Sequence, residues 1–213
     1  MPVMRSRSQT VRIAVRWSAI ALLTLLVALG LTEVRYAYAD ADEKLTLPGV
    51  ANFGRLAANL YRGANPEMAA YPSLRNFGID TVVRFSTGDE FIAAEKARVE
   101  SLGMAFISLP WRAADLPETN QVVSFLTLVR NHPEHTYFVH CREGVDRTGV
   151  MVAVYRVAID GWSTEQAIDE MKAFHYRYLL HPHLQSYVES FPSLIATEPS
   201  LQAVSITPSG DRH

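Results

Sequence analysis

Hydrophobic positions between Leu45 and Phe191 follow two alternating patterns. Short runs rich in β-branched and aromatic residues predict strands, and longer runs with apolar positions three or four residues apart predict helices. The expected strands are Asn59–Arg62, Thr81–Phe85, Ala105–Leu109 and Tyr137–Val139. The expected helices are Pro66–Asn76, Phe91–Leu102, Glu118–Arg130, Thr148–Ile159, Thr164–Phe174 and His183–Phe191. Because helices separate the strands, the pattern predicts an α/β fold with a central, mostly parallel sheet of about four or five strands flanked by helices.

The first 39 residues depart from this pattern. Four arginines precede an uncharged apolar run, residues 17–31, and Ala37-Tyr38-Ala39 has the small-x-small form of a cleavage site. We expect residues 1–39 to be a signal peptide cleaved after Ala39, or else an uncleaved membrane anchor. Either interpretation predicts export of residues 40 onward, to the periplasm or tethered to the inner membrane, with membrane contact only through an uncleaved residue 1–39 segment.

Composition bounds the remaining possibilities. A chain of 213 residues with 48% hydrophobic and 20% charged residues is typical of one soluble domain. Residues 1–39 hold five arginines and one glutamate, so the rest has 15 basic against 21 acidic residues and no broad basic surface for nucleic acid. We expect one domain over residues 40–191 and a flexible tail over 192–213. The single cysteine, Cys141, has no partner for an internal disulfide.

The segment His140–Gly149 is the most informative part of the chain. It leaves the strand that ends at Val139 and enters the helix that begins at Thr148. A loop between the carboxyl end of a strand and the start of a helix directs unpaired N–H groups toward one point, which favours an anion there. A cysteine at the start of such a loop has a lowered pKa, because the N–H groups and the helix dipole stabilise its thiolate.

Each polar residue of this segment has an expected role. Cys141 would be the nucleophile, and Arg147 would bind two oxygens of a tetrahedral anion with its planar guanidinium group. Gly144 would permit a positive φ or a close backbone approach, and Thr148 would hydrogen-bond the sulfur. His140 would orient the cysteine backbone through its ring.

The segment reads His-Cys-x-x-Gly-x-x-Arg-Thr-Gly, which resembles the signature of the protein tyrosine and dual-specificity phosphatases. Tyr61-Arg62-Gly63, Val152–Tyr155 and Gly161-Trp162-Ser163 look like the compact bacterial, exported members, and the resemblance covers roughly residues 55–185. It implies a dual-specificity phosphatase-like fold and hydrolysis through a phosphocysteine on Cys141, without metal or other cofactor. The substrate would be a phosphorylated protein or small phosphoester. The phosphate-binding loop would comprise Cys141, Arg142, Glu143, Gly144, Val145, Asp146 and Arg147.

Other functions remain open at this point. Arg142 would suit an inositol phosphate or phospholipid substrate with the same mechanism, although Glu143 and Asp146 lower the local positive potential. A phosphate-binding module without turnover belongs to a different class, but nucleophile, arginine and a candidate acid are all present. A rhodanese-like sulfur carrier or a buried core thiol at Cys141 does not account for the Arg-Thr-Gly sequence.

The general acid has two candidates. Asp115 lies in the loop after the strand Ala105–Leu109, and its alternative role is to cap the helix at 118–130 together with Glu118. Asp146 is the rival, with an ion pair to an arginine as its alternative role. His181 and His183 hint at a metal site but lack partnering cysteines or carboxylates, so no metal is expected.

Overall fold

The computed structural model describes residues 43–206. The expected signal peptide or anchor, residues 1–39, lies outside this range. Within the described range, no helix combines the length and apolar character needed to cross a membrane.

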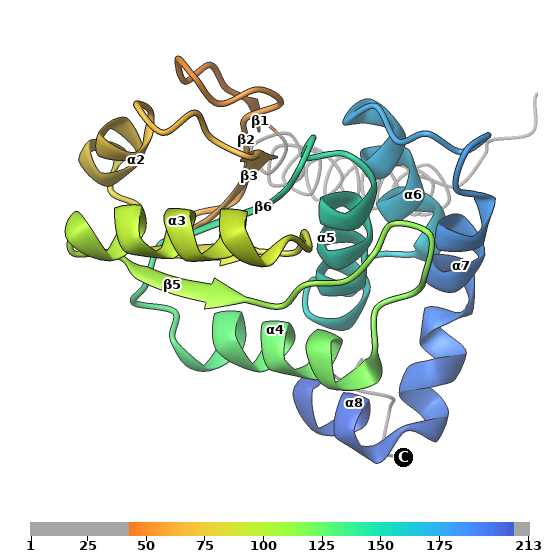
Figure 1. Ribbon diagram of the computed structural model, residues 1–213. Helices are drawn as coiled ribbons and strands as arrows, with labels where there is room; N and C mark the ends of the chain where they lie inside the picture. The colour runs from red at the N-terminus through yellow and green to blue at the C-terminus, as the bar shows by residue number, and fades with distance from the viewer. Residues whose placement is uncertain (1–42, 207–213) are drawn as a thin grey trace, which may run out of the picture. The chain divides into compact units, whose positions relative to one another are not determined.

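Six strands form one sheet in the order β1-β2-β3-β6-β4-β5 (Figure 1). They are β1 (Glu43–Lys44), β2 (Gly54–Ala57), β3 (Leu60–Ala64), β4 (Thr81–Arg84), β5 (Ala105–Ser108) and β6 (Tyr137–Cys141). Strands β3, β6, β4 and β5 are parallel neighbours, while β1 and β2 add an antiparallel edge. The expected α/β class and mostly parallel sheet are confirmed. The sequence did not predict β1 and β2, because both lack the β-branched and aromatic residues that mark strands.

Seven described helices flank the sheet. They are α2 (Tyr71–Phe77), α3 (Asp89–Ser101), α4 (Thr119–Asn131), α5 (Asp146–Ala158), α6 (Thr164–Ala173), α7 (Pro182–Thr197) and α8 (Pro199–Val204). The first six correspond to the expected helices, although the helix predicted from Pro66 starts at Tyr71. At the start of α6, Ser163 and Gln166 form reciprocal side chain to backbone hydrogen bonds of 3.3 and 2.9 Å, which fix the direction of this helix.

The carboxyl end of the chain differs from expectation. We expected a flexible tail from residue 192, because the last residues of the chain are rich in proline, serine and glycine. Instead α7 continues through Pro192 to Thr197, and α8 follows. Leu201 and Val204 of α8 are buried in the same core as residues of α4, so apolar burial holds this segment on the domain. The prediction was therefore wrong for residues 192–206, and 207–213 lie outside the described range.

Alternation along β6 divides its side chains between two cores. Val139 and Cys141 belong to the core under α4, α5, α6 and α7, whereas Phe138 belongs to the core under α2 and α3. Because successive strand residues point to opposite faces, His140 points to the α2 and α3 side. A His-Cys pair at the end of this strand thus places the cysteine beside α5 and the histidine beside α3.

Candidate active site

Contacts with strand β3 hold the loop between β6 and α5 in place. Gly144 has φ +68°, and a Cβ on it would lie 2.4 Å from the backbone of Gly63, so only glycine fits. Its carbonyl oxygen accepts hydrogen bonds from Arg62 Nη2 and Asn52 Nδ2, each at 2.9 Å. The expected close approach at Gly144 is present, and it holds the loop against the sheet.

Cys141 is the last residue of β6, and it is only 3% exposed. Burial raises the pKa of Cys141. Hydrogen bonds from the hydroxyl and the backbone N–H of Thr148, the charge of Arg147 and the N–H of Glu143 outweigh burial and lower that pKa below the ordinary value. No nitrogen or oxygen of the described residues is hydrogen-bonded to the buried Thr148 hydroxyl, so this hydroxyl is available to the sulfur of Cys141. These contacts favour a thiolate near neutral pH.

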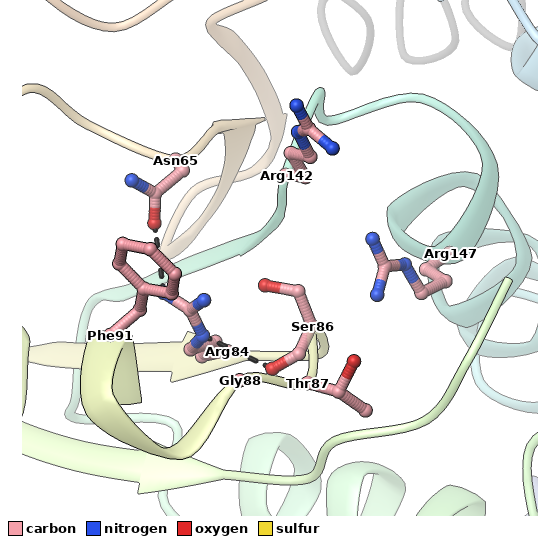
Figure 2. A pocket seen from close by; sticks show the side chains of 8 residues that line it. All are labelled: Asn65, Arg84, Ser86, Thr87, Gly88, Phe91, Arg142 and Arg147. Carbon is pink, nitrogen blue, oxygen red and sulfur yellow. Dashed lines mark hydrogen bonds between the residues drawn. The ribbon is translucent and has the colours of Figure 1, made fainter. Parts of the chain in front are cut away.

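A pocket of about 560 Å³ opens beside the loop (Figure 2). It is lined by Asn65, Arg84, Ser86, Thr87, Gly88, Phe91, Arg142 and Arg147. Arg147 extends into it from α5, and the ring of Phe91 lies on the opposite side. Nη1 of Arg147 donates to the carbonyl of Trp111 at 3.2 Å, which holds the guanidinium group at the pocket wall. The pocket therefore presents a fixed cation facing an aromatic ring.

A buried ionic network surrounds His140, the residue before Cys141. His140 Nδ1 lies 3.2 Å from the carbonyl oxygen of Cys141, which is the expected contact, and its Nε2 lies 2.7 Å from Glu95 Oε1. Burial raises the pKa of Glu95, but His140, the Tyr71 hydroxyl at 2.6 Å and the guanidinium of Arg84 lower it to about 2. The network fixes the backbone at Cys141.

Sequence reasoning missed Glu95, Tyr71 and Arg84. The sequence did contain a signal for Glu95. It is a carboxylate on the same helical face as the apolar Ile92 and Val99, and a charged residue on an apolar face suggests a buried partner. No local pattern could have paired it with His140, since the two come from different elements.

The carboxylate of Asp146 is hydrogen-bonded to Arg177. Its buried carboxylate accepts from the backbone N–H of Arg177 at 3.2 Å and from Nε of Arg177 at 3.0 Å. The same guanidinium lies 2.7 Å from Glu143 Oε2. Arg177 thus binds two carboxylates of the loop between β6 and α5. This arrangement matches the alternative role of Asp146 as an ion-pair partner and weighs against its role as the acid.

Asp115 lies on a loop that contacts the site. The carbonyl of Trp111 in this loop accepts from Arg147, and the carbonyl of Ala113 lies 3.3 Å from His183 Nε2 at the start of α7. The side chain of Asp115 itself is 58% exposed. The loop is therefore hydrogen-bonded to Arg147, while the carboxylate of Asp115 stays accessible to solvent.

The alternative role of Asp115 as a helix cap is wrong. The helix α4 begins at Thr119, and its N-cap is Glu118, whose backbone N–H donates to Gln121 Oε1 at 2.9 Å. The polar contact of Asp115 is with Arg112, whose Nε lies 3.8 Å from Oδ2. Asp115 is therefore free of the capping role.

The histidines near the loop bind protein groups. His183 contacts Ala113, and His181 Nε2 lies 3.8 Å from Asp146 Oδ2. Among the described residues, the side chains with spacing for a metal ion are elsewhere, at the amino end of β6: His132, Glu134 and His135.

The family and the relatives that the chain matches are phosphatases. The family described as "DSP-PTPase phosphatase fused to NAD+ Kinase" matches residues 51–179. The dual specificity protein phosphatase TpbA of Pseudomonas aeruginosa is 31% identical over 122 residues, covering 57% of this chain and 53% of TpbA. An inositol diphosphatase of Oryza sativa is 25% identical over 140 residues, covering 63% of this chain and 61% of the relative. The chain thus spans about half the length of TpbA.

The fold is likewise similar to that of a solved relative. The crystal structure of P. aeruginosa TpbA superposes with a TM-score of 0.60 at 25% identity, covering 74% of this chain and 98% of the solved one. The similarity therefore extends over the whole of the solved TpbA domain.

Proposed function

The chain belongs to the family described as DSP-PTPase phosphatase fused to NAD+ kinase, and from this premise we propose that it is a protein tyrosine or dual-specificity phosphatase acting through a phosphocysteine on Cys141. The observation that carries the proposal is the setting of Cys141. Its pKa is lowered by Thr148, Arg147 and a loop N–H despite burial. A lowered thiol pKa in an anion-binding loop is what a nucleophilic cysteine needs.

The first step transfers the phosphoryl group to sulfur. The thiolate of Cys141 attacks phosphorus, and an S–P bond forms as the P–O bond to the leaving group breaks. The planar guanidinium of Arg147 and the loop N–H groups stabilise the negative charge on the equatorial oxygens. Asp115 donates its proton to the leaving oxygen, which departs as a neutral alcohol or phenol.

The second step restores the enzyme. The carboxylate of Asp115 takes a proton from water as the water oxygen attacks phosphorus. The S–P bond breaks, and Cys141 returns to the thiolate as inorganic phosphate leaves. Apart from the attacking water, both steps use only side chains and backbone groups of this chain.

The pocket supports phosphotyrosine as one substrate. Phe91 is 64% exposed although it is a large apolar residue, and it lies across the pocket from Arg147 (Figure 2). An aryl ring attached to a phosphate held by Arg147 would pack against this ring. Asn65 and Ser86 line the same pocket with polar groups, which are compatible with phosphoserine or phosphothreonine.

An inositol phosphate or phospholipid is the second candidate substrate. Arg142 and Arg147 line one pocket, so a second anionic group could bind the exposed Arg142 while Arg147 holds the reacting phosphate. The rice relative is named as an inositol diphosphatase, which also supports an inositol phosphate substrate. Arg84 adds little positive potential, because Glu95 pairs with it.

Turnover of an aryl phosphate by the purified protein tests this proposal. We expect hydrolysis in the presence of a chelator, and we expect Cys141→Ser to abolish turnover while keeping phosphate affinity. A wild-type protein that binds phosphate without hydrolysing any ester would instead be a phosphate-binding module. Relative rates on phosphotyrosine peptide, phosphoserine peptide and inositol polyphosphate then assign the substrate class.

We also propose export to the periplasm, with an inner-membrane anchor as the alternative. The support is in the sequence alone, where arginines precede the apolar run 17–31 and Ala37-Tyr38-Ala39 follows it.

A further inference from the structure

A second cluster of ligand-type side chains lies at the opposite end of β6 from Cys141. His132, Glu134 and His135 come just before this strand, which begins at Tyr137. One ligand atom from each residue lies within 4.8 Å of the other two. The phosphatase chemistry uses none of the three.

Two of the distances between these atoms are close to those of a tetrahedral zinc site. His132 Nδ1 lies 3.3 Å from Glu134 Oε1, and His135 Nε2 lies 3.6 Å from the same oxygen. Zinc binds imidazole nitrogen and carboxylate oxygen at about 2.0–2.2 Å, which puts neighbouring tetrahedral ligands roughly 3.3–3.5 Å apart. Each side chain is about half exposed, so the fourth position is open to water.

A carboxylate behind the cluster orients one of its histidines. Asp80 Oδ1 lies 3.2 Å from His135 Nδ1, on the side of the ring away from Glu134. Asp80 is itself fixed, because its Oδ2 accepts from the backbone N–H of Thr136 at 3.0 Å. When Nδ1–H donates to Asp80, the lone pair of Nε2 is directed toward Glu134. Metal-binding histidines characteristically have such a carboxylate partner.

The backbone holds the cluster together without a metal. His132 is the C-cap of α4, and its carbonyl accepts from the backbone N–H of His135 and from the hydroxyl of Tyr137, each at 3.1 Å. The turn that separates the two histidines is therefore formed in advance.

We propose that His132, Glu134 and His135 form a surface site for Zn²⁺, with Asp80 as the residue that positions His135 and with water as the fourth ligand. Two imidazoles and one carboxylate suit zinc better than Mg²⁺ or Ca²⁺, which prefer oxygen ligands. A bound ion links the end of α4 to the segment leading into β6, and it stabilises the folded domain in proportion to its occupancy.

Calorimetric titration of the protein with zinc chloride tests the site. The protein carries Cys141→Ser, so that the thiolate does not compete for zinc. We expect one Zn²⁺ per chain, no comparable binding of Mg²⁺, and an affinity at least about 10-fold lower in His132→Ala and in His135→Ala. Asp80→Asn should weaken binding about 10–100-fold. The control His175→Asn changes another exposed histidine, at φ +69° where asparagine is tolerated, and should leave zinc affinity unchanged.

Thermal unfolding gives a second readout. Zinc at 100 times its Kd should raise the Tm of the parent by about 5–10 °C and should not raise that of His132→Ala. The Tm of each variant without zinc separates loss of a ligand from loss of the fold. The proposal is overturned if the parent binds no zinc, or if folded His132→Ala and His135→Ala bind it as tightly as the parent.

Discussion

Thr148 is the residue whose hydrogen bonds lower the pKa of Cys141 most strongly. We predict that Thr148→Ala raises this pKa, because the thiolate loses the side-chain donor while burial remains. The pH dependence of alkylation by iodoacetamide measures the change, and its midpoint should move to higher pH. Thr148→Ser keeps the hydroxyl and should keep the wild-type midpoint. An unchanged midpoint in the alanine variant would show that the loop N–H groups and Arg147 suffice.

Asp115 can be tested through the leaving group. A proton donor matters most when the departing oxygen is strongly basic. We predict that Asp115→Asn slows hydrolysis of phenyl phosphate by about 10²–10⁴-fold but that of an activated nitroaryl ester far less. It should also remove the basic limb of the pH–rate profile.

The matched control for Asp115 is Asp146→Asn, whose carboxylate is occupied by Arg177. It should show no dependence on the leaving group. Equal losses on both esters in Asp115→Asn would rule out this residue as the donor.

The placement of Cys141, Arg147 and Thr148 in one loop between a strand and a helix could be predicted, because these residues are nearly contiguous in the sequence. Cys141, Arg147 and Thr148 meet through one turn at the start of α5, so spacing alone gave their arrangement. Glu95 could not be predicted in the same way. Its contact with His140 depends on how α3 packs on the sheet, which no local pattern specifies.

At the scale of elements, Glu95 joins α3 to β6. Folding lowers its pKa from 4.5 to about 2, so the ionised carboxylate stabilises the fold above about pH 4.5. That contribution is lost as the pH falls toward about 2. We predict that Glu95→Gln costs about 3–5 kcal/mol at pH 7, because it leaves the buried guanidinium group of Arg84 without its ion-pair partner. Denaturant unfolding at several pH values measures this cost, which should shrink below pH 4.5.

The control for Glu95 is Glu100→Gln on the same helix. The side chain of Glu100 is 52% exposed, so this variant should have little effect at any pH. A Glu95→Gln variant whose cost is the same at pH 3 and pH 7 would contradict the ionised network.

Helices and strands with a clear apolar periodicity were predicted correctly. Short strands and the proline-containing carboxyl-terminal segment were not. The strands and helices from Leu60 to Ala173 were expected in their observed order, because their apolar periods differ clearly. The helix α8 was missed, because the proline and serine content of the tail suggested disorder. Burial of Leu201 and Val204 holds this helix on the domain instead.

At the scale of the whole molecule, the parallel sheet gathers the site at one edge. Asn65 follows β3, Ser86 follows β4, Trp111 follows β5, and Cys141 ends β6. The carboxyl ends of parallel strands meet at one edge, where ligands bind in such folds. The zinc site that we propose lies at the other edge, so the two sites can be tested independently.

Export is a prediction for the full-length chain. If residues 1–39 are a cleaved signal, the protein recovered from the periplasm should begin at Asp40, because cleavage follows Ala39. N-terminal sequencing of protein expressed from the full gene measures this. Material that is recovered from membranes with residues 1–39 intact would favour the anchor instead.

The central claim is that Cys141 carries the phosphoryl group during turnover. Rapid acid quenching during hydrolysis of an aryl phosphate, followed by peptide mass spectrometry, tests it directly. The account predicts one phosphoryl group on the peptide containing Cys141, more of it in Asp115→Asn if water activation is slowed, and none in Cys141→Ser. Undiminished turnover with no phosphorylated Cys141 peptide, or appreciable turnover by Cys141→Ser, would contradict it.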